Sequence, residues 1–491
     1  MQRKKIAVFD KTLHRKISYG DLLVAAFALS FRLKKCPERF IGIMLPTSVA
    51  AMVAILATLI AGKTPVMINY VMGPEESVRR ARERCGVKTI ITSKKLLERR
   101  GIESVSGMIF AETVIAGLTM REKLWGLFAS YFPSSFISPG TIYDYAVILF
   151  TTGSEKEPKI VPLTHKNICS NVEGMARAVH ITSSDVIVAV LPFFHVFGFT
   201  ATFILPLWKG ASIVAHSNPL DYASVVGSVK EHQGTFFVAT PTFYAGYLKK
   251  SSPGDFSSMR VMVSGADKLS RELQDEFTRV HGITIMEGYG TTETSPAISI
   301  NRREANRPGS IGQPLDNLQV KIVDMENGQE LARGKEGKIL VKGDSVMEGY
   351  YRDPEATKAC LQEGWYDTGD IGVMDEDGYL WHRGRYKRFI KVAGEMVSLV
   401  AIENKLQQVV PPETMICVVE IPAKGGHPEI VVATTKAFDE EACYQHLVHS
   451  FPRFAVPKRY VLMEELPIQG SGKIDFRKVQ ALCVAKLNEL G

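Results

Sequence analysis

The 491-residue sequence lacks the features that mark several common classes of protein. Its seven cysteines are scattered, with no CxxC pair and no histidine at zinc-ligand spacing, which argues for a reducing compartment and against disulfides or a structural metal. The charged start, MQRKKIAVFDKTLHRK, is followed by no apolar segment of signal-peptide length, so we do not expect export. The longest uncharged apolar stretch, residues 49–61, is shorter than the ~18 residues of a membrane span and predicts a core helix. We therefore expect a cytoplasmic protein.

Long runs of like charge are also absent from the sequence. The net charge of +7 is spread along the chain, and no run of five like charges occurs. A solvated surface explains this excess, although an acidic partner or a membrane surface would also suit it. We expect no nucleic-acid partner. With 45% hydrophobic and 23% charged residues the composition is that of a globular protein, and the length predicts two or three domains.

Helical and strand patterns alternate through roughly the first 290 residues and predict parallel sheets covered by helices. The predicted buried strands are residues 41–45, 88–92, 145–150, 186–191, 212–215, 236–239 and 261–264. Helices are predicted between them, for example at residues 75–84 and 222–232. Short strands and turns at residues 309–382 predict a small β-barrel or distorted sheet, and a mixed α+β segment follows from Gly384. The fold class is therefore α/β, with two helix-covered, mostly parallel sheets, a small β-barrel and a small α+β C-terminal part.

Residues 120–132, MREKLWGLFASYF, form an amphipathic helical pattern rich in large apolar side chains. Packing of this helix on the main domain is the simpler expectation. Contact with a membrane surface is the alternative, and it would make the protein membrane-associated at its periphery.

The stretch TTGSEKEPK, residues 151–159, follows the apolar run 146–150 and combines hydroxyls, a glycine and a lysine. Backbone N–H groups in such a loop can hold phosphate oxygens, although a solvated turn would have the same composition. The GxxxxGK[ST] spacing of a P-loop is absent. The stretch alone is therefore equally compatible with an anion site of another kind and with a solvated turn.

Six more motifs follow this loop. They are LPFFHVFGF (191–199), VSGADKL (263–269), EGYGTTETSP (287–296), GWYDTGD (364–370), GRYKRFIKVAGEMVS (384–398) and LPIQGSGKIDFRK (466–478). In this order the series resembles the acyl-adenylate-forming (AMP-binding) superfamily of acyl-CoA synthetases, luciferases and peptide-synthetase adenylation domains. Within that superfamily FTTGSE, HSNPLDY and KVAGEMVS most resemble bacterial acyl-acyl carrier protein synthetases, including the synthetase half of 2-acylglycerophosphoethanolamine acyltransferase.

The resemblance implies an ATP-dependent fatty acid ligase that forms an acyl-AMP and transfers the acyl group to acyl carrier protein. A fatty acyl-CoA synthetase with the same adenylation chemistry is the alternative. A non-catalytic nucleotide or fatty-acid binding protein is a second alternative, because Lys156 and Ile160 stand where many relatives have glycines. The stretch 196–208 contains no acidic residue, which argues against an amino-acid substrate.

Two anions meet in this reaction, so positive charge and hydrogen-bond donors are needed where charge develops. The resemblance implies that Lys473 bridges the attacking carboxylate and the α-phosphate, and that Thr291 and Thr292 reach the α-phosphate. Glu293 is the implied Mg²⁺ ligand, since Mg²⁺ prefers one or two carboxylates with phosphates and water. His195 is the implied gate of the acyl tunnel, although a lone histidine there could also be a core residue.

The resemblance also implies how the nucleoside is held. Tyr289 would stack on the adenine, Asp370 would accept the ribose hydroxyls, and Arg385 would reinforce that contact. The remaining implied ATP contacts are Thr151, Thr152, Gly153, Ser154, Lys159, Gly265, Ala266, Glu287, Gly288 and Gly290. The expected acyl pocket is lined by Gly198, Phe199, Thr242, Gly265 and Gly288.

The family alternates between two positions of its C-terminal domain, which implies an N-terminal domain at residues 1–384 and a mobile domain at residues 385–491. The implied hinge is near Lys387, and rotation would bring Gly394 to the site. An acidic carrier protein is expected to dock on basic residues near the thiol entrance. The candidates are Arg383, Arg388, Lys391, Arg453, Lys458 and Arg459.

Overall fold

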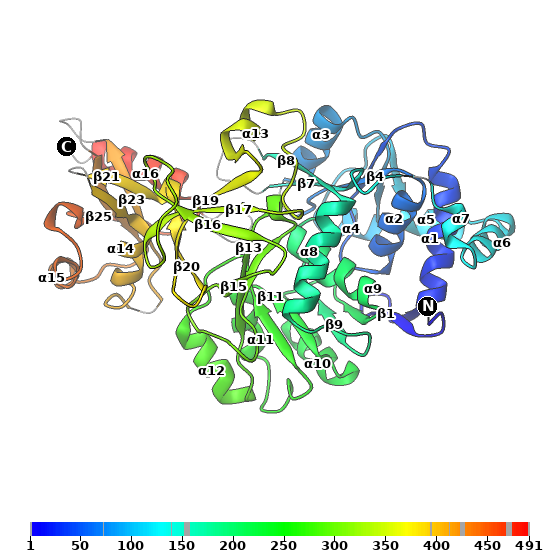
Figure 1. The fold of residues 1–491 in the computed structure, drawn as a ribbon, viewed down its shortest axis with the longest axis horizontal. Coiled ribbons are helices and arrows are strands. Elements are labelled where there is room, and N and C mark those ends of the chain that lie inside the picture. The colour runs from blue at the N-terminus through cyan, green and yellow to red at the C-terminus, as the bar shows by residue number, and fades with distance from the viewer. Residues whose placement is uncertain are drawn as a thin grey trace.

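The computed structural model describes residues 2–71, 73–138, 140–151, 158–392, 395–411, 413–422, 428–467 and 474–489 (Figure 1). The structure contains two helix-covered sheets, an antiparallel sheet, and a smaller α+β part at the C-terminal end. The predicted fold class is confirmed.

The first sheet has six strands in the order β6-β5-β3-β4-β7-β8. Their bounds are β3 (Phe40–Ile43), β4 (Thr64–Met67), β5 (Ile90–Thr92), β6 (Met108–Phe110), β7 (Tyr145–Phe150) and β8 (Ile160–Thr164). All neighbours are parallel except the β7–β8 hairpin. The predicted core helix is α2 (Val49–Ile60), whose N-cap Ser48 side chain accepts a hydrogen bond from the Ala51 N–H.

The second sheet has nine strands in the order β15-β14-β13-β12-β11-β9-β10-β1-β2. Their bounds are β1 (Ile6–Asp10), β2 (Arg15–Ser18), β9 (Val186–Ala189), β10 (Ser212–Ala215), β11 (Phe236–Ala239), β12 (Val261–Ser264), β13 (Met286–Gly290), β14 (Ala297–Ile300) and β15 (Gln313–Pro314). The strands from β13 to β1 pair in parallel, and antiparallel strands occupy both edges. One apolar core joins this sheet to the first, because Ile43 and Val188 belong to the same buried cluster.

Helices cover both sheets. The main ones are α1 (Tyr19–Leu33), α3 (Pro74–Cys85), α8 (His165–Ala178), α10 (Tyr222–His232), α11 (Pro241–Leu248) and α12 (Arg271–His281). The predicted helices at residues 75–84 and 222–232 are α3 and α10, and α10 has the predicted bounds. Asp221 caps α10 by accepting a hydrogen bond from the Ser224 N–H, and Gln233 ends it in the left-handed conformation.

The predicted small barrel corresponds to a half-barrel-like sheet of antiparallel strands. Its members are β16 (Gln319–Val323), β17 (Glu336–Lys342), β18 (Leu361–Gln362), β19 (Trp365–Met374) and β20 (Leu380–Arg385). The register between β19 and β20 places Asp370 opposite Arg385. Two motifs of the sequence are therefore adjacent on neighbouring strands.

The C-terminal part, on the left in Figure 1, contains the hairpin β21 (Phe389–Val392) and β22 (Glu395–Ser398). It continues with the sheet β23 (Ile416–Pro422), β24 (Pro428–Thr434) and β25 (Arg459–Leu462) and the helices α14 (Leu399–Leu406), α15 (Glu440–Val448) and α16 (Phe476–Glu489). Buried apolar clusters lie on both faces of that sheet, one containing Ile402 and Leu447 and the other Val479 and Cys483. Its mobility and the boundary at residue 385 stay predictions.

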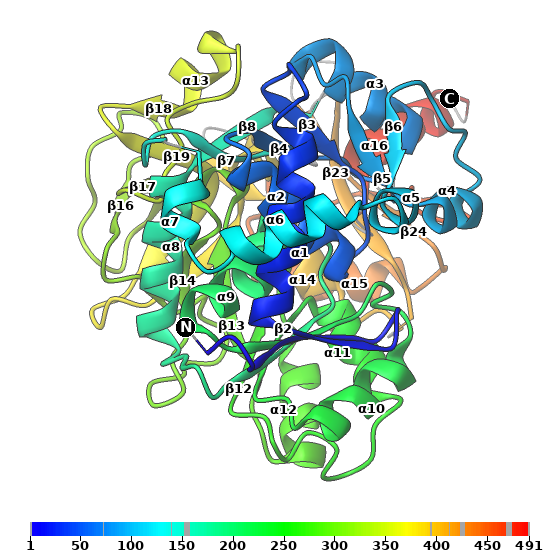
Figure 2. The same cartoon turned by 90° about the vertical axis from the view of Figure 1, so that its right-hand side faces the viewer.

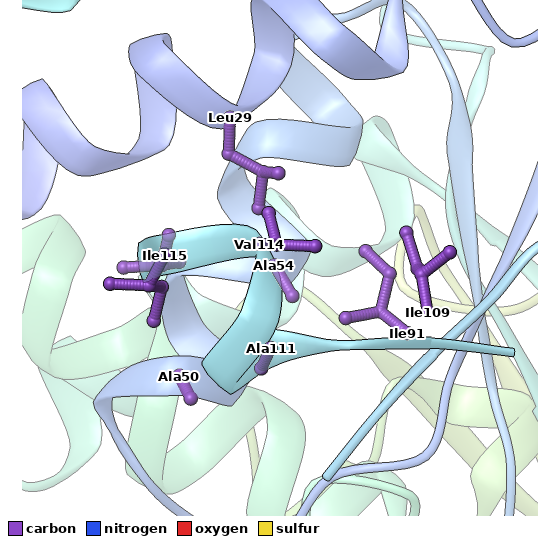
Figure 3. Close-up of a pocket in the computed structure, with 9 residues that line it drawn as sticks. Leu29, Ala50, Ala54, Ile91, Ile109, Ala111, Val114 and Ile115 are labelled. Carbon is purple, nitrogen blue, oxygen red and sulfur yellow. The ribbon is translucent and has the colours of Figure 1, made fainter. Parts of the chain in front are cut away.

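The predicted helix at residues 120–132 is α6 (Met120–Ala129), which lies across α1 on the face toward the viewer in Figure 2. It follows α5 (Ala111–Ala116) and precedes the short α7 (Pro133–Phe136). A small pocket lined by apolar side chains of α1, α2 and α5, among them Leu29, Ala54 and Ile115, lies beside this segment (Figure 3). Within the described ranges, no helix has both the length and the apolarity needed to span a bilayer.

Candidate nucleotide and acyl site

The phosphate-loop motif joins the two strands of the β7–β8 hairpin. The Thr151 N–H donates to the Lys159 carbonyl at 3.0 Å, and the Lys159 N–H donates to Thr151 Oγ1 at 3.1 Å. These two bonds continue the register Phe150↔Ile160 and hold the ends of the loop together. Thr152, Gly153 and Ser154, like Lys156, lie outside the described residues. Of the predicted loop contacts, the structure describes the two at the loop ends.

The carboxyl ends of β12 and β13 bring a second group of predicted residues together. Their parallel register pairs Ser264 with Glu287, so Gly265 and Ala266 lie beside the EGYG motif. A Cβ on Gly265 would lie 2.9 Å from the Phe197 ring, which allows no side chain there. The Ser264 hydroxyl is buried without a hydrogen-bond partner among the described residues. Ligands of α/β sheets bind at such strand ends, and an unsatisfied hydroxyl suits a polar ligand.

Glu287 is fixed within this edge. Its Oε1 accepts a hydrogen bond from the Leu269 N–H at 3.2 Å, and burial raises the pKa of its carboxyl. Packing leaves no room for a side chain at Gly290, because a Cβ there would lie 2.0 Å from the Pro296 carbonyl oxygen. Gly288 has more room, with the nearest atom, on Val263, 3.3 Å from its Cβ position. The three residues shape the strand end.

Asp370 is the most enclosed charged group of the site, with 1% of its surface exposed. Its Oδ2 accepts a hydrogen bond from the Tyr289 hydroxyl at 2.5 Å. Arg385 Nε and His382 Nε2 lie 2.9 and 3.3 Å from Oδ1, which nonetheless accepts no well-directed hydrogen bond from the described residues. Burial opposes ionisation, but the nearby His382 imidazole and the charge of Arg385 hold the pKa of Asp370 below its usual value. The carboxylate therefore stays charged and keeps acceptor capacity.

Glu293 follows β13 in a short 3₁₀ turn, η2 (Thr292–Thr294). Its Oε1 accepts a hydrogen bond from the Tyr350 hydroxyl at 2.8 Å, and its carbonyl accepts one from the Met347 N–H. The Tyr350 ring lies 4.6 Å from Lys159 Nζ. Tyr350 therefore contacts both the phosphate-loop end and the predicted metal ligand. Thr291 caps the turn through the Thr294 hydroxyl.

The residues expected at the acyl pocket lie in different surroundings. His195 is half-buried, with its ring 4.6 Å from the Phe194 ring, and its carbonyl accepts a hydrogen bond from the Phe199 N–H. Phe199 packs against Phe203 in the core, and a Cβ on Gly198 would meet the Pro192 carbonyl at 2.3 Å. Thr242 is exposed on α11. The tunnel itself stays a prediction.

Three residues of the site were not predicted from the sequence: Tyr350, His382 and Phe197. Phe197 lies within the motif at residues 191–199, and His382 lies just before the motif that begins at residue 384. Tyr350 is placed only by tertiary contact, since it is 57 residues from Glu293. Lys473 and Gly394 lie outside the described residues, so their roles stay predictions. Within the described chain, no group of three or more histidine, cysteine or acidic side chains could hold a metal ion by itself.

The chain is similar to several known proteins. A model of the AMP-binding enzyme family matches residues 1–351. The long-chain-fatty-acid–CoA ligase of Bacillus subtilis is 29% identical, over 95% of this chain and 90% of the relative. The ligase of the same name from Salmonella typhimurium is 30% identical, over 69% of this chain and 61% of the relative. The crystal structure of ATP-bound MatB from Rhodopseudomonas palustris aligns with a TM-score of 0.85 at 23% identity, covering 98% of this chain and 96% of that one, which shows the shared fold.

Proposed function

The chain belongs to the AMP-binding enzyme family and is an acyl-adenylate-forming ligase, and we propose that it uses ATP to join a fatty acid to the thiol of coenzyme A. In the first step a carboxylate oxygen attacks the α-phosphate, an acyl-adenylate forms and pyrophosphate leaves. In the second step the thiol sulfur attacks the acyl carbonyl carbon and AMP leaves. The likeness to long-chain-fatty-acid–CoA ligases supports a fatty acid as the acid substrate.

The observation that carries the proposal is the buried Asp370 carboxylate with an oxygen that accepts no hydrogen bond from the described residues. Two neighbouring ribose hydroxyls are donors of the required kind, and they would exchange hydrogen bonds with water for hydrogen bonds to a charged acceptor. Arg385 and Tyr289 hold the carboxylate in place. A nucleoside is therefore the ligand that this carboxylate suits.

The phosphates are assigned to the strand ends and the hairpin loop. Lys159 and Thr151 close the base of the loop, and Thr291 and Thr292 follow the end of β13. Hydroxyls and backbone N–H groups there would stabilise the negative charge that builds up at the α-phosphate. Lys473 is assigned to bridge the attacking carboxylate and that phosphate.

Mg²⁺ fits the carboxylate chemistry of the site. Glu293 would supply one ligand to it, with phosphate oxygens and water as the others. When bound, the ion would neutralise phosphate charge. Tyr350 would keep the Glu293 carboxylate oriented through its hydrogen bond.

Acyl carrier protein is the competing acceptor. The KVAGEMVS motif supports it, whereas the relatives named above are CoA ligases. The prediction that Arg388 is a docking residue is wrong, because its side chain is buried with 7% exposure and pairs with Glu403. Arg383 and Arg459 lie near Glu336 and Glu429, which reduces their free positive charge. Coenzyme A is therefore the acceptor we favour.

The test measures the two half-reactions separately. We expect palmitate-dependent exchange of pyrophosphate into ATP, followed by faster thioester formation with coenzyme A than with acyl carrier protein. Faster transfer to the carrier protein would reverse the choice of acceptor while leaving the ligase assignment intact. Absence of acid-dependent exchange across fatty acids of different chain length would favour the non-catalytic alternative.

A matched pair of variants tests the nucleotide site. Asp370→Asn removes the charge facing Arg385 and should reduce exchange by at least about tenfold through weaker ATP binding, roughly 1.4 kcal/mol. Asp377→Asn removes an exposed ion pair with Arg307 and should leave exchange unchanged. Equal activities for the two variants would contradict the role of Asp370.

A further inference from the structure

Exposed apolar side chains gather on one segment of the molecule. Of the twenty large apolar side chains that are exposed among the described residues, ten lie between residues 115 and 143. The most exposed are Met120 at 70%, Tyr131 at 61% and Leu124 at 58%. Single exposed apolar side chains need no explanation, but a contiguous group marks an interaction surface.

The orientation of α6 produces this exposure. The helix buries Glu122, Gly126 and Ala129, which are spaced four and three residues apart and face α1. A Cβ on Gly126 would lie 2.6 Å from the Val24 carbonyl oxygen, so the two helices touch through their backbones. Leu124, Leu127 and Phe128 occupy the opposite side. The large apolar side chains therefore point away from the protein, which reverses the usual direction of an amphipathic surface helix.

The attachment of α6 is specific. Glu122 accepts hydrogen bonds from Arg32 at 2.6 and 2.7 Å, and these hold the pKa of its carboxyl at about 2. Glu122 also completes a capping box with Thr119. Below the helix, the Trp125 ring contacts the Phe31 and Phe136 rings. The outward face is thus built by contacts that fix the helix in this direction.

Positive charge surrounds the apolar face. Arg121 and Lys123 are exposed on α6. Arg3 lies 4.0 Å from the Tyr131 ring, Lys34 Nζ donates to the Phe136 carbonyl, and Lys35 Nζ lies 5.0 Å from the Phe31 ring. The only acidic side chain of α6, Glu122, is buried and neutralised by Arg32. The face therefore combines large apolar side chains with cations that form no ion pair with an acidic side chain of the described residues.

We propose that this α6 face, made of Ile115, Met120, Leu124, Leu127, Phe128, Tyr131 and Phe132, docks on an anionic lipid bilayer. A bilayer interface accepts aromatic and aliphatic side chains at its acyl boundary and attracts cations to its headgroups, and this face supplies both. The ten-residue helix would lie in the plane of the interface rather than cross it. Ile115 also lines the apolar pocket formed with side chains of α1 and α2 (Figure 3). The inference is independent of the acid and of the thiol acceptor.

The test is flotation of the full-length protein with vesicles of phosphatidylcholine alone or with about 30% phosphatidylglycerol. We expect the wild type to float with the anionic vesicles and much less with the neutral ones. The double variant Leu124→Asp, Phe128→Asp should partition at least about tenfold more weakly, because it replaces two apolar contacts with anions. Arg121→Gln, Lys123→Gln should lose most of the dependence on phosphatidylglycerol while retaining the apolar side chains.

A matched control carries the same chemical change elsewhere. Leu220→Asp, Leu462→Asp alters two leucines with exposures of 59% and 55%, and should bind vesicles like the wild type. Unchanged circular dichroism and unchanged acid-dependent exchange establish that each variant is folded. Retained binding by the α6 variant, or equal loss by the control, would overturn the proposal. So would a wild-type dimer that the α6 variant converts to a monomer while vesicle binding persists, because a second copy would then be what covers this face.

Discussion

Tyr350 connects two parts of the candidate site that are distant in the sequence. Its hydroxyl donates to Glu293 and its ring lies beside the Lys159 ammonium. Burial raises the pKa of its phenol, so the hydroxyl stays protonated and remains a donor at neutral pH. A change at this one residue should therefore affect Glu293 selectively.

We expect Tyr350→Phe to weaken Mg²⁺-dependent ATP use about tenfold, since a hydrogen bond to a charged group contributes roughly 1.5–3 kcal/mol. The ring stays in place for Lys159. The measurement is the Mg²⁺ concentration that gives half-maximal exchange, with the Michaelis constant for the fatty acid measured in parallel. Tyr351→Phe, in the neighbouring residue that packs on Phe40 and Tyr145, is the control. A matching shift in the fatty-acid constant would indicate a general structural effect.

At the residue scale, the sequence predicted the residues of the motifs but not the side chains that contact and orient them. Asp370 and Arg385 were predicted together, and strand register brings them into contact. Tyr350 and His382 were not predicted, because no spacing relates Tyr350 to Glu293 or marks His382 as a neighbour of Asp370. Such contacts depend on how separate strands and turns meet in space. Buried Arg388 shows the converse limit, since a basic residue near a predicted entrance can face inward.

Elements were predicted well where local signals agree. Helix α10 has its predicted bounds because Asp221 starts it and Gln233 ends it. Helix α6 was predicted by its pattern, but ends at Ala129 rather than at residue 132. The direction of its apolar face could not be predicted. Both its faces contain apolar residues, and close contact at Gly126 decides which one meets α1.

Gly126→Ala tests that contact. Alanine favours a helix over glycine by roughly 1 kcal/mol, but a methyl group here would lie 2.6 Å from the Val24 carbonyl oxygen. We expect a net loss of about 1–3 kcal/mol in the free energy of unfolding, because α6 must move away from α1. Gly227→Ala in α10 is the control, since its added methyl group meets nothing within 4 Å and should stabilise the protein slightly. Denaturant unfolding measures both changes, and stabilisation by Gly126→Ala would contradict the close packing.

At the scale of the whole molecule, a short junction separates two sets of contacts. Arg385 is held by Asp370, and the Tyr386 ring lies 4.6 Å from Lys338 Nζ. Arg388 instead pairs with Glu403 and lies 5.0 Å from the Phe476 ring. Lys387 alone lies between these groups of contacts. If Lys387 is the predicted hinge, a backbone change at this residue would reorient the C-terminal part and would also change the approach of Val400 to Gly384, where the Val400 Cβ lies 3.6 Å from the Cβ position of the glycine.

Two substitutions should separate the half-reactions. Lys387→Pro fixes φ near −65° and should leave adenylation intact while stopping thioester formation. Lys473→Ala should abolish adenylation and leave transfer from supplied acyl-adenylate largely intact. Rapid-quench measurement of acyl-AMP and thioester distinguishes the steps, and Lys387→Ala, which removes the charge without fixing φ, is the control. Equal impairment of both steps by both variants would contradict a two-position C-terminal domain.

The position of Arg385 has a thermodynamic consequence. It pairs with the carboxylate proposed to hold the ribose, and it is also two residues before the junction at Lys387. If reorientation of the C-terminal part changes the Arg385–Asp370 pair, the affinity for nucleotide must differ between the two orientations. Reciprocity of coupling free energies then requires nucleotide to shift the balance of orientations by the same factor. The bound nucleotide would thereby bias which of the two orientations the C-terminal part adopts for as long as the ribose site is occupied.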